Sequence, residues 1–341
     1  MSETTDLQVT IDEIVGACDR IRGHVHRTPT LSSATAAAWT RVATGVGIRD
    51  DRLFLKAENL QKTGSFKPRG MTNKVATLPD AAKANGVITL SAGNAGQAYA
   101  WAGRSAGVPV TVVMPEGAVR SKVDACLGYG ARVVLHGAHV GETFAEMERL
   151  RDAEGLVFVH PFDDPAVIAG HGSIGLEMLE DVPDLDVVVV GVGGGGLISG
   201  VAAALKERRP GIRVYGVEPE LSNAMSLALE RNEVVRIQPE SVADGLGAPF
   251  AGVWTLAMCQ RYLDGIVLLD DPTILAGLRF AAERTKQLLE PAGAAALAAV
   301  LFGRLPIASG ERVCVVASGG NVDIGRLGEL IAAAAPLPTA R

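Results

Sequence analysis

The sequence predicts an α/β protein whose sheets are mainly parallel and covered by helices on both faces. Short strands rich in valine and isoleucine alternate with helical patterns along most of the 341 residues. Several strands are followed by a loop of small residues and then a helix, as at the carboxyl ends of parallel strands. The length suits two domains or one large α/β unit, and without a long linker any domain division must be compact.

The expected elements follow one another closely along the chain. An amphipathic helix over 9–22 comes first, then a short helix over 34–39, a strand over 52–56 and a helix over 68–77. Further strands are expected at 87–90, 110–114, 132–135, 156–160, 187–190, 214–217, 266–269 and 313–317. Helical patterns separate them at 96–106, 118–128, 141–153, 166–181, 197–209, 273–288, 292–302 and 324–334.

Charge and cysteine usage exclude several classes of protein. Lysine and arginine number 32 against 38 acidic residues, and without a basic run neither nucleic acid nor an anionic membrane is an expected partner. The four cysteines form no C-x-x-C pair, which suits reduced thiols in a cytoplasmic protein. No signal peptide opens the chain, and the uncharged stretch 187–205 holds too many glycines for a spanning helix. We therefore expect a soluble protein.

The stretch Thr63–Gly70 contains a lysine in a constrained position. Lys67 stands between Phe66 and Pro68, and a residue before proline is pushed away from the α region, whereas proline itself suits the first turn of a helix. Lys67 is therefore expected at a loop-to-helix junction, with its amine projecting from a fixed backbone. Taken alone, the stretch is equally compatible with an ordinary exposed lysine at a helix start.

Two glycine-containing loops follow predicted strands and are candidate anion sites. In Ser91–Gln97 the small residues expose backbone N–H groups at a helix start, where a carboxylate could dock, and Ser91 and Asn94 add donors. In Gly191–Leu197 four consecutive glycines, Gly193 to Gly196, leave amides that can wrap a phosphate. For the first loop the alternative is a helix cap without a ligand.

The second loop also has a competing interpretation. Gly191, Gly193 and Gly196 fit G-x-G-x-x-G, and the next strand ends at Glu218, about where a dinucleotide fold places its ribose-binding acid. An NAD-dependent oxidoreductase is therefore an alternative, although it leaves Lys67 and the loop around Asn94 unexplained.

Two later segments complete the set of candidate site residues. After the last predicted strand, Ser318–Asn321 places a hydroxyl that could face the ring nitrogen of a bound heterocycle; a capped turn is the alternative. Glu290 precedes a helix of small residues, and either lines a cofactor cleft or charges the helix N-terminus. The six histidines show no H-E-x-x-H pattern, so we expect each to be structural or to lie on the surface.

In this order and spacing, the motifs resemble the fold type II pyridoxal-phosphate enzymes, with a tryptophan synthase β-like fold. The nearest resemblance is to the serine/threonine dehydratases and serine racemases, and it extends from Arg27 through Asp163–Gly170 to Asn321. It implies a large domain of 1–78 and 158–341 and a small mobile domain of 79–157 carrying the Asn94 loop. Relatives are commonly dimers, which implies a homodimer here. The sequence stops soon after Ser318, where biosynthetic threonine dehydratases continue into a C-terminal regulatory domain, so we expect no such domain and a catabolic use.

The resemblance further implies a role for each candidate residue. Lys67 would form the Schiff base with pyridoxal 5′-phosphate, and the glycines would hold its phosphate. The remaining cofactor contacts would come from Phe66, Asn94 at the ring hydroxyl, Glu290, Ser318 at the ring nitrogen, and Gly319. Substrate would contact Ser65, Ser91, Ala92, Gly93 and Asn94. The family often binds a divalent cation near the position of Glu218, and a divalent or monovalent cation is possible here.

The implied reaction is β-elimination of L-threonine, L-serine or a related 3-hydroxy amino acid to a 2-keto acid and ammonia, with Lys67 as the base. Ala92 stands where serine racemases carry the serine that serves as second acid/base. A methyl group transfers no proton, so a dehydratase is favoured over a racemase. An amino-acid racemase or a 3-hydroxyaspartate dehydratase on the same scaffold is the second alternative. Many relatives have a histidine at Ala95.

The neutral hydroxyl of Ser318 would weaken the electron sink and favour elimination. A non-catalytic cofactor-binding protein is disfavoured, because every implied catalytic position is filled.

Overall fold

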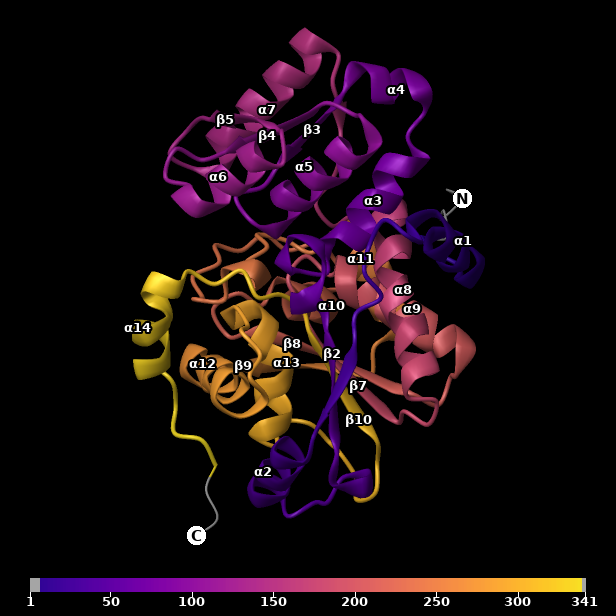
Figure 1. Ribbon diagram of the computed structural model, residues 1–341, viewed down its shortest axis with the longest axis vertical. Coiled ribbons are helices and arrows are strands. Elements are labelled where there is room, and N and C mark those ends of the chain that lie inside the picture. The colour runs from indigo at the N-terminus through magenta and orange to yellow at the C-terminus, as the bar shows by residue number, and fades with distance from the viewer. Residues whose placement is uncertain (1–6, 339–341) are drawn as a thin grey trace.

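The computed structural model describes residues 7–338, which form two separate sheets (Figure 1). A six-stranded sheet has the order β1-β2-β10-β7-β8-β9, and a four-stranded sheet has the order β5-β4-β3-β6. The larger sheet comprises β1 Thr30–Ser33, β2 Leu53–Ala57, β7 Val187–Gly191, β8 Arg213–Pro219, β9 Gly265–Leu269 and β10 Val313–Ala317. The smaller comprises β3 Val87–Leu90, β4 Val110–Met114, β5 Arg132–Leu135 and β6 Val157–Phe158.

Both sheets are parallel with one exception. Only β1 runs antiparallel, with Leu31 opposite Leu55 of β2. The strand β10 lies between β2 and β7, so the last strand of the described chain occupies an interior position in the sheet. The carboxyl ends of β2, β7, β8 and β10 consequently share one edge, where the loops after them meet.

Helices cover both faces of the six-stranded sheet, and successive strand residues face opposite helix layers. Val188 and Val190 join the apolar cluster beneath one layer, whereas Val187 and Val189 join the cluster beneath the other. The first layer contains α1 Ile11–Ile21, α8 Pro165–Asp181, α9 Gly196–Arg208, α10 Ala224–Arg231 and α11 Val253–Tyr262. The second contains α2 Ala34–Thr44, α12 Asp271–Phe280, α13 Pro291–Leu301 and α14 Leu327–Ala332.

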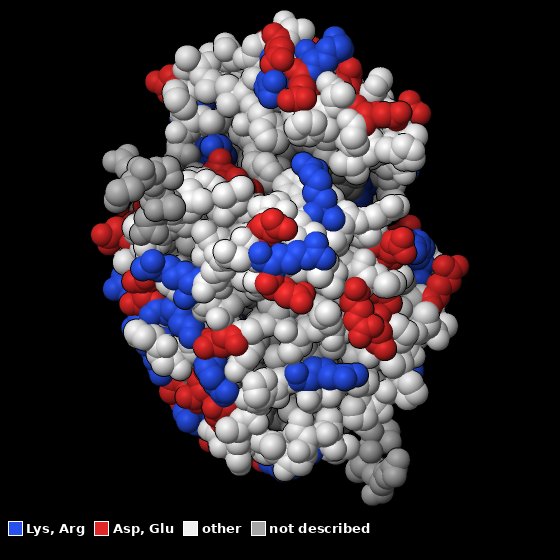
Figure 2. Space-filling view, turned by 180° about the vertical axis from the view of Figure 1, so that it is seen from behind, with Lys and Arg blue, Asp and Glu red and all other residues white. Residues whose placement is uncertain are grey.

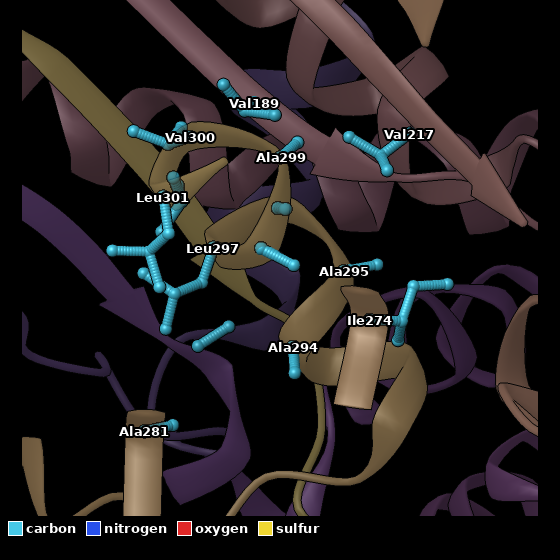
Figure 3. Close-up of a cluster of buried hydrophobic side chains, with 14 of the residues drawn as sticks. Val189, Val217, Ile274, Ala281, Ala294, Ala295, Leu297, Ala299, Val300 and Leu301 are labelled. Carbon is cyan, nitrogen blue, oxygen red and sulfur yellow. The ribbon is translucent and has the colours of Figure 1, made fainter. Parts of the chain in front are cut away.

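The helix α13 is the centre of the second layer (Figure 3). All of its residues are buried, as expected of a helix that is apolar on every side. Its side chains pack between Val189 and Val217 of the sheet and Ile274 of α12. This packing fixes the start of α13, which follows Glu290, relative to the carboxyl edge of the strands.

The four-stranded sheet lies at one end of the molecule, at the top of Figure 1. One of its faces packs on α3 Lys67–Thr77, α5 Asn94–Ala106 and α6 Arg120–Gly128. The other face packs on α7 Val140–Glu154, and a short α4 Asp80–Asn85 precedes β3. The helix α3 also packs on α8, so it connects the half of the molecule built on the four-stranded sheet to the half built on the six-stranded sheet.

The predicted α/β class with mainly parallel, helix-covered sheets is confirmed, and most boundaries agree within a few residues. The strand expected at 156–160 is shorter and comprises only Val157 and Phe158. The helix expected over 273–288 ends at Phe280 and continues as a π-helical turn, Ala281–Thr285. The helix expected over 34–39 extends to Thr44. The elements β1, α4, α10 and α11 were not predicted from the sequence.

The surface carries charges of both signs. On the face shown in Figure 2, acidic and basic side chains are interspersed among neutral ones. Between residues 7 and 338, no helix combines the length and apolar character needed to cross a membrane.

Candidate active site

Lys67 is the first residue of α3, which begins one residue earlier than the predicted start at Pro68, so Lys67 lies at the expected loop-to-helix junction. The preceding backbone is tied to the turn after β10, since Ser65 forms an isolated antiparallel bridge with Gly319. The N–H of Phe66 donates to the carbonyl of Ser318 at 3.0 Å. The Lys67 side chain therefore leaves a backbone that is held on both sides.

The amine of Lys67 lies in a desolvated environment. Its Nζ donates to the carbonyl of Pro161 at 2.8 Å and lies 5.1 Å from the centre of the Phe66 ring. Burial lowers the pKa of this amine to about 8, because the charged form loses its hydration. A lysine in this state holds a substantial neutral fraction near neutral pH and can act as a nucleophile or a base.

The first turn of α3 is anchored by a buried ion-pair network that begins two residues after Lys67. Arg69 is fully buried, and its guanidinium donates to both oxygens of Glu58 at 2.8 Å and to Glu177 of α8 at 2.7 Å. Such paired geometry fixes a guanidinium in both distance and orientation. The start of α3, and with it Lys67, is held against α8.

The four glycines form a bare loop between β7 and α9. Gly195 is the N-cap of α9 with φ of 92°, a conformation that favours glycine. A Cβ at Gly194 would collide with the ring of Phe162, and one at Gly195 would lie 2.5 Å from Cε of Met225. The N–H groups of Gly194, Gly195 and Gly196 donate to no acceptor in the described part of the chain. Free amides at the start of a 13-residue helix suit an anion.

Asn94 joins the smaller sheet to the larger one. As the first residue of α5, it donates from Nδ2 to Oε1 of Glu290 at 2.7 Å. Its Oδ1 accepts from Nδ2 of Asn321 at 2.8 Å, and Asn321 also donates to the carbonyl of Thr63. In the same loop, Oγ of Ser91 accepts from the N–H of Gly93 at 3.2 Å. The structure thus brings the Asn94 loop, Glu290 and the turn after β10 together.

Glu290 lies inside this site. It precedes α13 but makes no side-chain capping bond, and it is only 4% exposed. Burial raises the pKa of its carboxyl to about 7, and the negative charge of Asp244 adds to the effect. A Cβ at Gly319 would collide with Oε1 of Glu290, so these two residues are in close contact. Glu290 thus contacts Asn94 and Gly319 and does not cap α13 with its side chain, and its role in lining a cofactor cleft stays a prediction.

Two hydroxyl groups line the same region. Ser65 is fully buried, and its Oγ has no hydrogen-bond partner in the described part of the protein. Ser318 is 5% exposed and lies one residue before Gly319. A buried hydroxyl without a partner is costly unless a ligand or water satisfies it, so Ser65 indicates a polar ligand at this position.

Glu218 occupies a different environment. Its buried carboxylate accepts from the N–H groups of Met225 and Ser226 at 2.8 Å and from the Ser226 hydroxyl at 2.6 Å. Burial raises the pKa of this carboxyl to about 7. Within 7–338 no group of three or more His, Cys, Asp or Glu side chains could hold a metal ion. A cation at Glu218 would have to share the carboxylate with the start of α10, and a ribose would meet the same competition.

Sequence reasoning assigned no site role to the three residues that follow His160. The carbonyl of Pro161 accepts from Lys67, Phe162 packs on Gly194 and Gly196, and Asp163 accepts from α11. Their position directly after a predicted strand was the available signal, because ligands gather at strand ends. The partnership of Asn321 with Asn94 was also missed, since it depends on long-range placement.

These features fit pyridoxal phosphate. Lys67 offers an amine with a lowered pKa for an aldehyde, the glycine loop offers amides for a phosphate, and Ser65 offers a hydroxyl without a partner. The side chains of Asn94 and Ser318 lie in the same region, where they could bond the polar atoms of an aromatic heterocycle.

Comparison with known proteins agrees with this chemistry. Residues 21–319 match the sequence model of the family described as pyridoxal-phosphate dependent enzyme. The L-threonine ammonia-lyase of Thermotoga maritima is 40% identical over 324 residues, which cover 95% of this chain and 78% of that protein. The catabolic L-threonine dehydratase TdcB of Escherichia coli strain K12 is 39% identical over 333 residues, covering 97% and 98% of the two chains.

A solved structure shows the same architecture. Maize serine racemase superposes with a TM-score of 0.88 at 34% identity, covering 94% of this chain and 96% of that one. The resemblance drawn from the motifs is thereby confirmed. This protein belongs to the family of pyridoxal-phosphate dependent enzymes.

Proposed function

We propose that the protein is an ammonia-lyase that eliminates the β-hydroxyl of L-threonine, L-serine or a related 3-hydroxy amino acid, yielding a 2-keto acid and ammonia. The observation that carries the proposal is Lys67, whose buried amine with a pKa of about 8 lies among the loops that match a cofactor of this family. Similarity to threonine dehydratases over most of the chain supports the substrate class.

The proposed cofactor contacts follow the positions of the side chains. Lys67 would hold the aldehyde, Gly193 to Gly196 the phosphate, Asn94 the ring hydroxyl and Ser318 the ring nitrogen, while Phe66, Glu290 and Gly319 would line the ring. When bound, pyridoxal phosphate supplies the electron sink that stabilises negative charge at the substrate Cα. The protein supplies position, desolvation and a base.

Substrate binding and proton transfer involve two different segments. The loop Ser91–Asn94 lies at the start of α5, where a helix N-terminus and hydroxyl donors favour the substrate carboxylate. Ser65 offers a further hydroxyl nearby. Lys67 removes the α-proton, because its neutral amine is poised near physiological pH.

Ala92 bears on the outcome of the reaction. Its methyl group cannot return a proton to Cα, so we propose that loss of the β-hydroxyl prevails over racemisation. Amino-acid racemisation is kept as the second candidate, because serine racemase structures are close neighbours of this fold. An assay of L-threonine and L-serine for keto acid, ammonia and D-enantiomer separates the two. Epimerised substrate that forms as fast as keto acid would reverse the order.

The catalytic assignment is tested with Lys67→Ala. We expect it to lose ammonia release by at least about a thousandfold, since a proton-transfer group and the covalent anchor are both removed. Lys62→Ala is the matched control, because Lys62 lies in the turn Lys62–Gly64 just before α3 and makes no side-chain ion pair in the described structure. Ammonia release by Lys67→Ala at the rate of the parent enzyme would refute the assignment.

We further propose that 79–157 moves as a small domain against 1–78 and 158–341, that two copies form a dimer, and that the enzyme acts in the cytoplasm. The four free cysteines support the last point. The four-stranded sheet, with strands between Val87 and Phe158, supports the first.

A further inference from the structure

Thr255 contacts the glycine loop, Gly193 to Gly196, through its side-chain hydroxyl. It lies in the first turn of α11 and is fully buried. Its Oγ1 donates to the carbonyl of Gly194 at 2.7 Å and accepts from the N–H of Gly252 at 2.9 Å. The hydroxyl thus satisfies the start of its own helix and holds one peptide of the loop. None of the cofactor contacts proposed above includes this residue.

The geometry of the peptide bond gives this contact a direction. In a trans peptide the carbonyl of Gly194 and the N–H of Gly195 point in opposite directions, and residues 7–338 contain no cis peptide. When Thr255 holds the carbonyl, the amide of Gly195 is turned away from Thr255 and carries no other partner among the described residues. Gly195 can rotate easily because it has no side chain, so the orientation depends on this bond.

Thr255 is itself held by the segment that contacts Lys67. The carboxylate of Asp163 accepts from the N–H groups of Val253 and Thr255 at 3.0 and 3.1 Å, which caps α11. Next to Asp163, Phe162 packs on Gly194 and Gly196. The loop is therefore contacted by the ring of Phe162 and by the hydroxyl of Thr255, whose helix is capped by Asp163.

We propose that Thr255 is a positioning residue, which orients the peptide between Gly194 and Gly195 so that the loop amides accept the cofactor phosphate. The inference rests on the proposed phosphate role of the glycine loop. It predicts that the hydroxyl of Thr255 contributes to affinity for the phosphate and not for the rest of the cofactor.

The test compares two ligands on the full-length chain stripped of cofactor. Pyridoxal phosphate and pyridoxal share the aldehyde, ring hydroxyl and ring nitrogen, and only the first carries a phosphate. Absorbance titration gives both dissociation constants. The dissociation constant for pyridoxal divided by that for pyridoxal phosphate is the ratio that reports the phosphate contribution. Thr255→Val keeps the shape and removes the hydroxyl; we expect the ratio to fall about five- to tenfold, the usual effect of one hydrogen bond. Thr255→Ser should keep the parent ratio.

A general loosening of the fold would give a different pattern. Equal weakening of both ligands in Thr255→Val, or an unchanged ratio, would overturn the role of Thr255. A parent protein that binds pyridoxal as tightly as pyridoxal phosphate would instead overturn the phosphate role of the loop itself. If Thr255→Val does not fold, Thr255→Ser and Thr255→Ala form a second pair that differs only in the hydroxyl. A lower ratio in the alanine variant supports the proposal, and equal ratios overturn it.

Discussion

Lys67 combines a fixed backbone with an amine whose surroundings favour the neutral form. The backbone is held by the bridge between Ser65 and Gly319, by the proline after Lys67 and by the anchored Arg69. The amine itself donates to the carbonyl of Pro161, and its burial lowers its pKa. Position and protonation are therefore set by different contacts, and each can be perturbed separately.

The lowered pKa of Lys67 predicts how cofactor capture depends on pH. Only the neutral amine can bond to the cofactor aldehyde, and its fraction rises as pH approaches about 8 from below. We expect the rate of covalent attachment to the stripped enzyme to rise about tenfold per pH unit up to that pKa and then level off. A small aliphatic amine with an ordinary pKa of about 10.4 serves as the control, since its rate keeps rising. Absorbance after rapid mixing measures both, and identical profiles would contradict the lowered pKa.

At the scale of elements, α3 and α8 cross where two glycines meet. A Cβ at Gly170 would lie 2.5 Å from the carbonyl oxygen of Arg69 and 2.7 Å from Cα of Gly70. The contacts are backbone atoms, which cannot move aside as a flexible side chain can. Close approach of these helices places the Lys67 end of α3 against the larger half of the molecule.

Gly170→Ala is therefore expected to destabilise the protein by about 1–3 kcal/mol through overpacking. Urea unfolding measures the change in the free energy of unfolding. Gly141→Ala is the matched control: Gly141 lies in α7 with open space at its Cβ, and alanine there should be neutral or stabilising by up to about 1 kcal/mol. Equal effects of the two substitutions would show that the crossing does not depend on Gly170.

Much of this architecture could be predicted from the sequence because strand and helix periods are local. The runs of β-branched residues give β4, β7 and β10 almost to the residue, and the glycine loop and Lys67 stand where their neighbours predict. The strand β1 was missed because Thr30–Ser33 is short and polar and is specified by pairing with β2. Similarly, Thr255 and Asn321 acquire their roles only from contacts with Gly194 and Asn94, which local patterns do not encode.

At the scale of the whole molecule, two sets of contacts next to the candidate active site join the part built on the four-stranded sheet to the part built on the six-stranded sheet. Asn94 bonds Glu290 and Asn321, and Lys122 of α6 forms an ion pair with Asp244. The Asp244 side chain is 60% exposed, so the ion pair lies at the rim of the interface. These contacts would break if the small domain opened as proposed.

Lys122→Met should therefore favour the open form modestly. An ion pair of this exposure contributes about 0.2–1 kcal/mol, so we expect kcat/KM to fall by up to about fivefold. High salt should produce a similar loss in the parent enzyme and a smaller one in the variant, because screening weakens the same pair. Arg120→Met is the control, since Arg120 pairs with Asp124 within α6. A larger effect of the control than of Lys122→Met would contradict a bridging role.

The interior position of β10 has a consequence for synthesis on the ribosome. This strand separates β2 from β7, yet it is made after every other strand in the described chain, and the turn behind it holds Ser65, Phe66 and Asn94. Until it emerges, β2 and β7 expose unpaired edges, and Lys67 lacks the backbone that fixes it. We therefore expect a nascent chain that ends before Val313 to be unable to capture cofactor. Loading would mark the moment at which translation of the catalytic unit is complete.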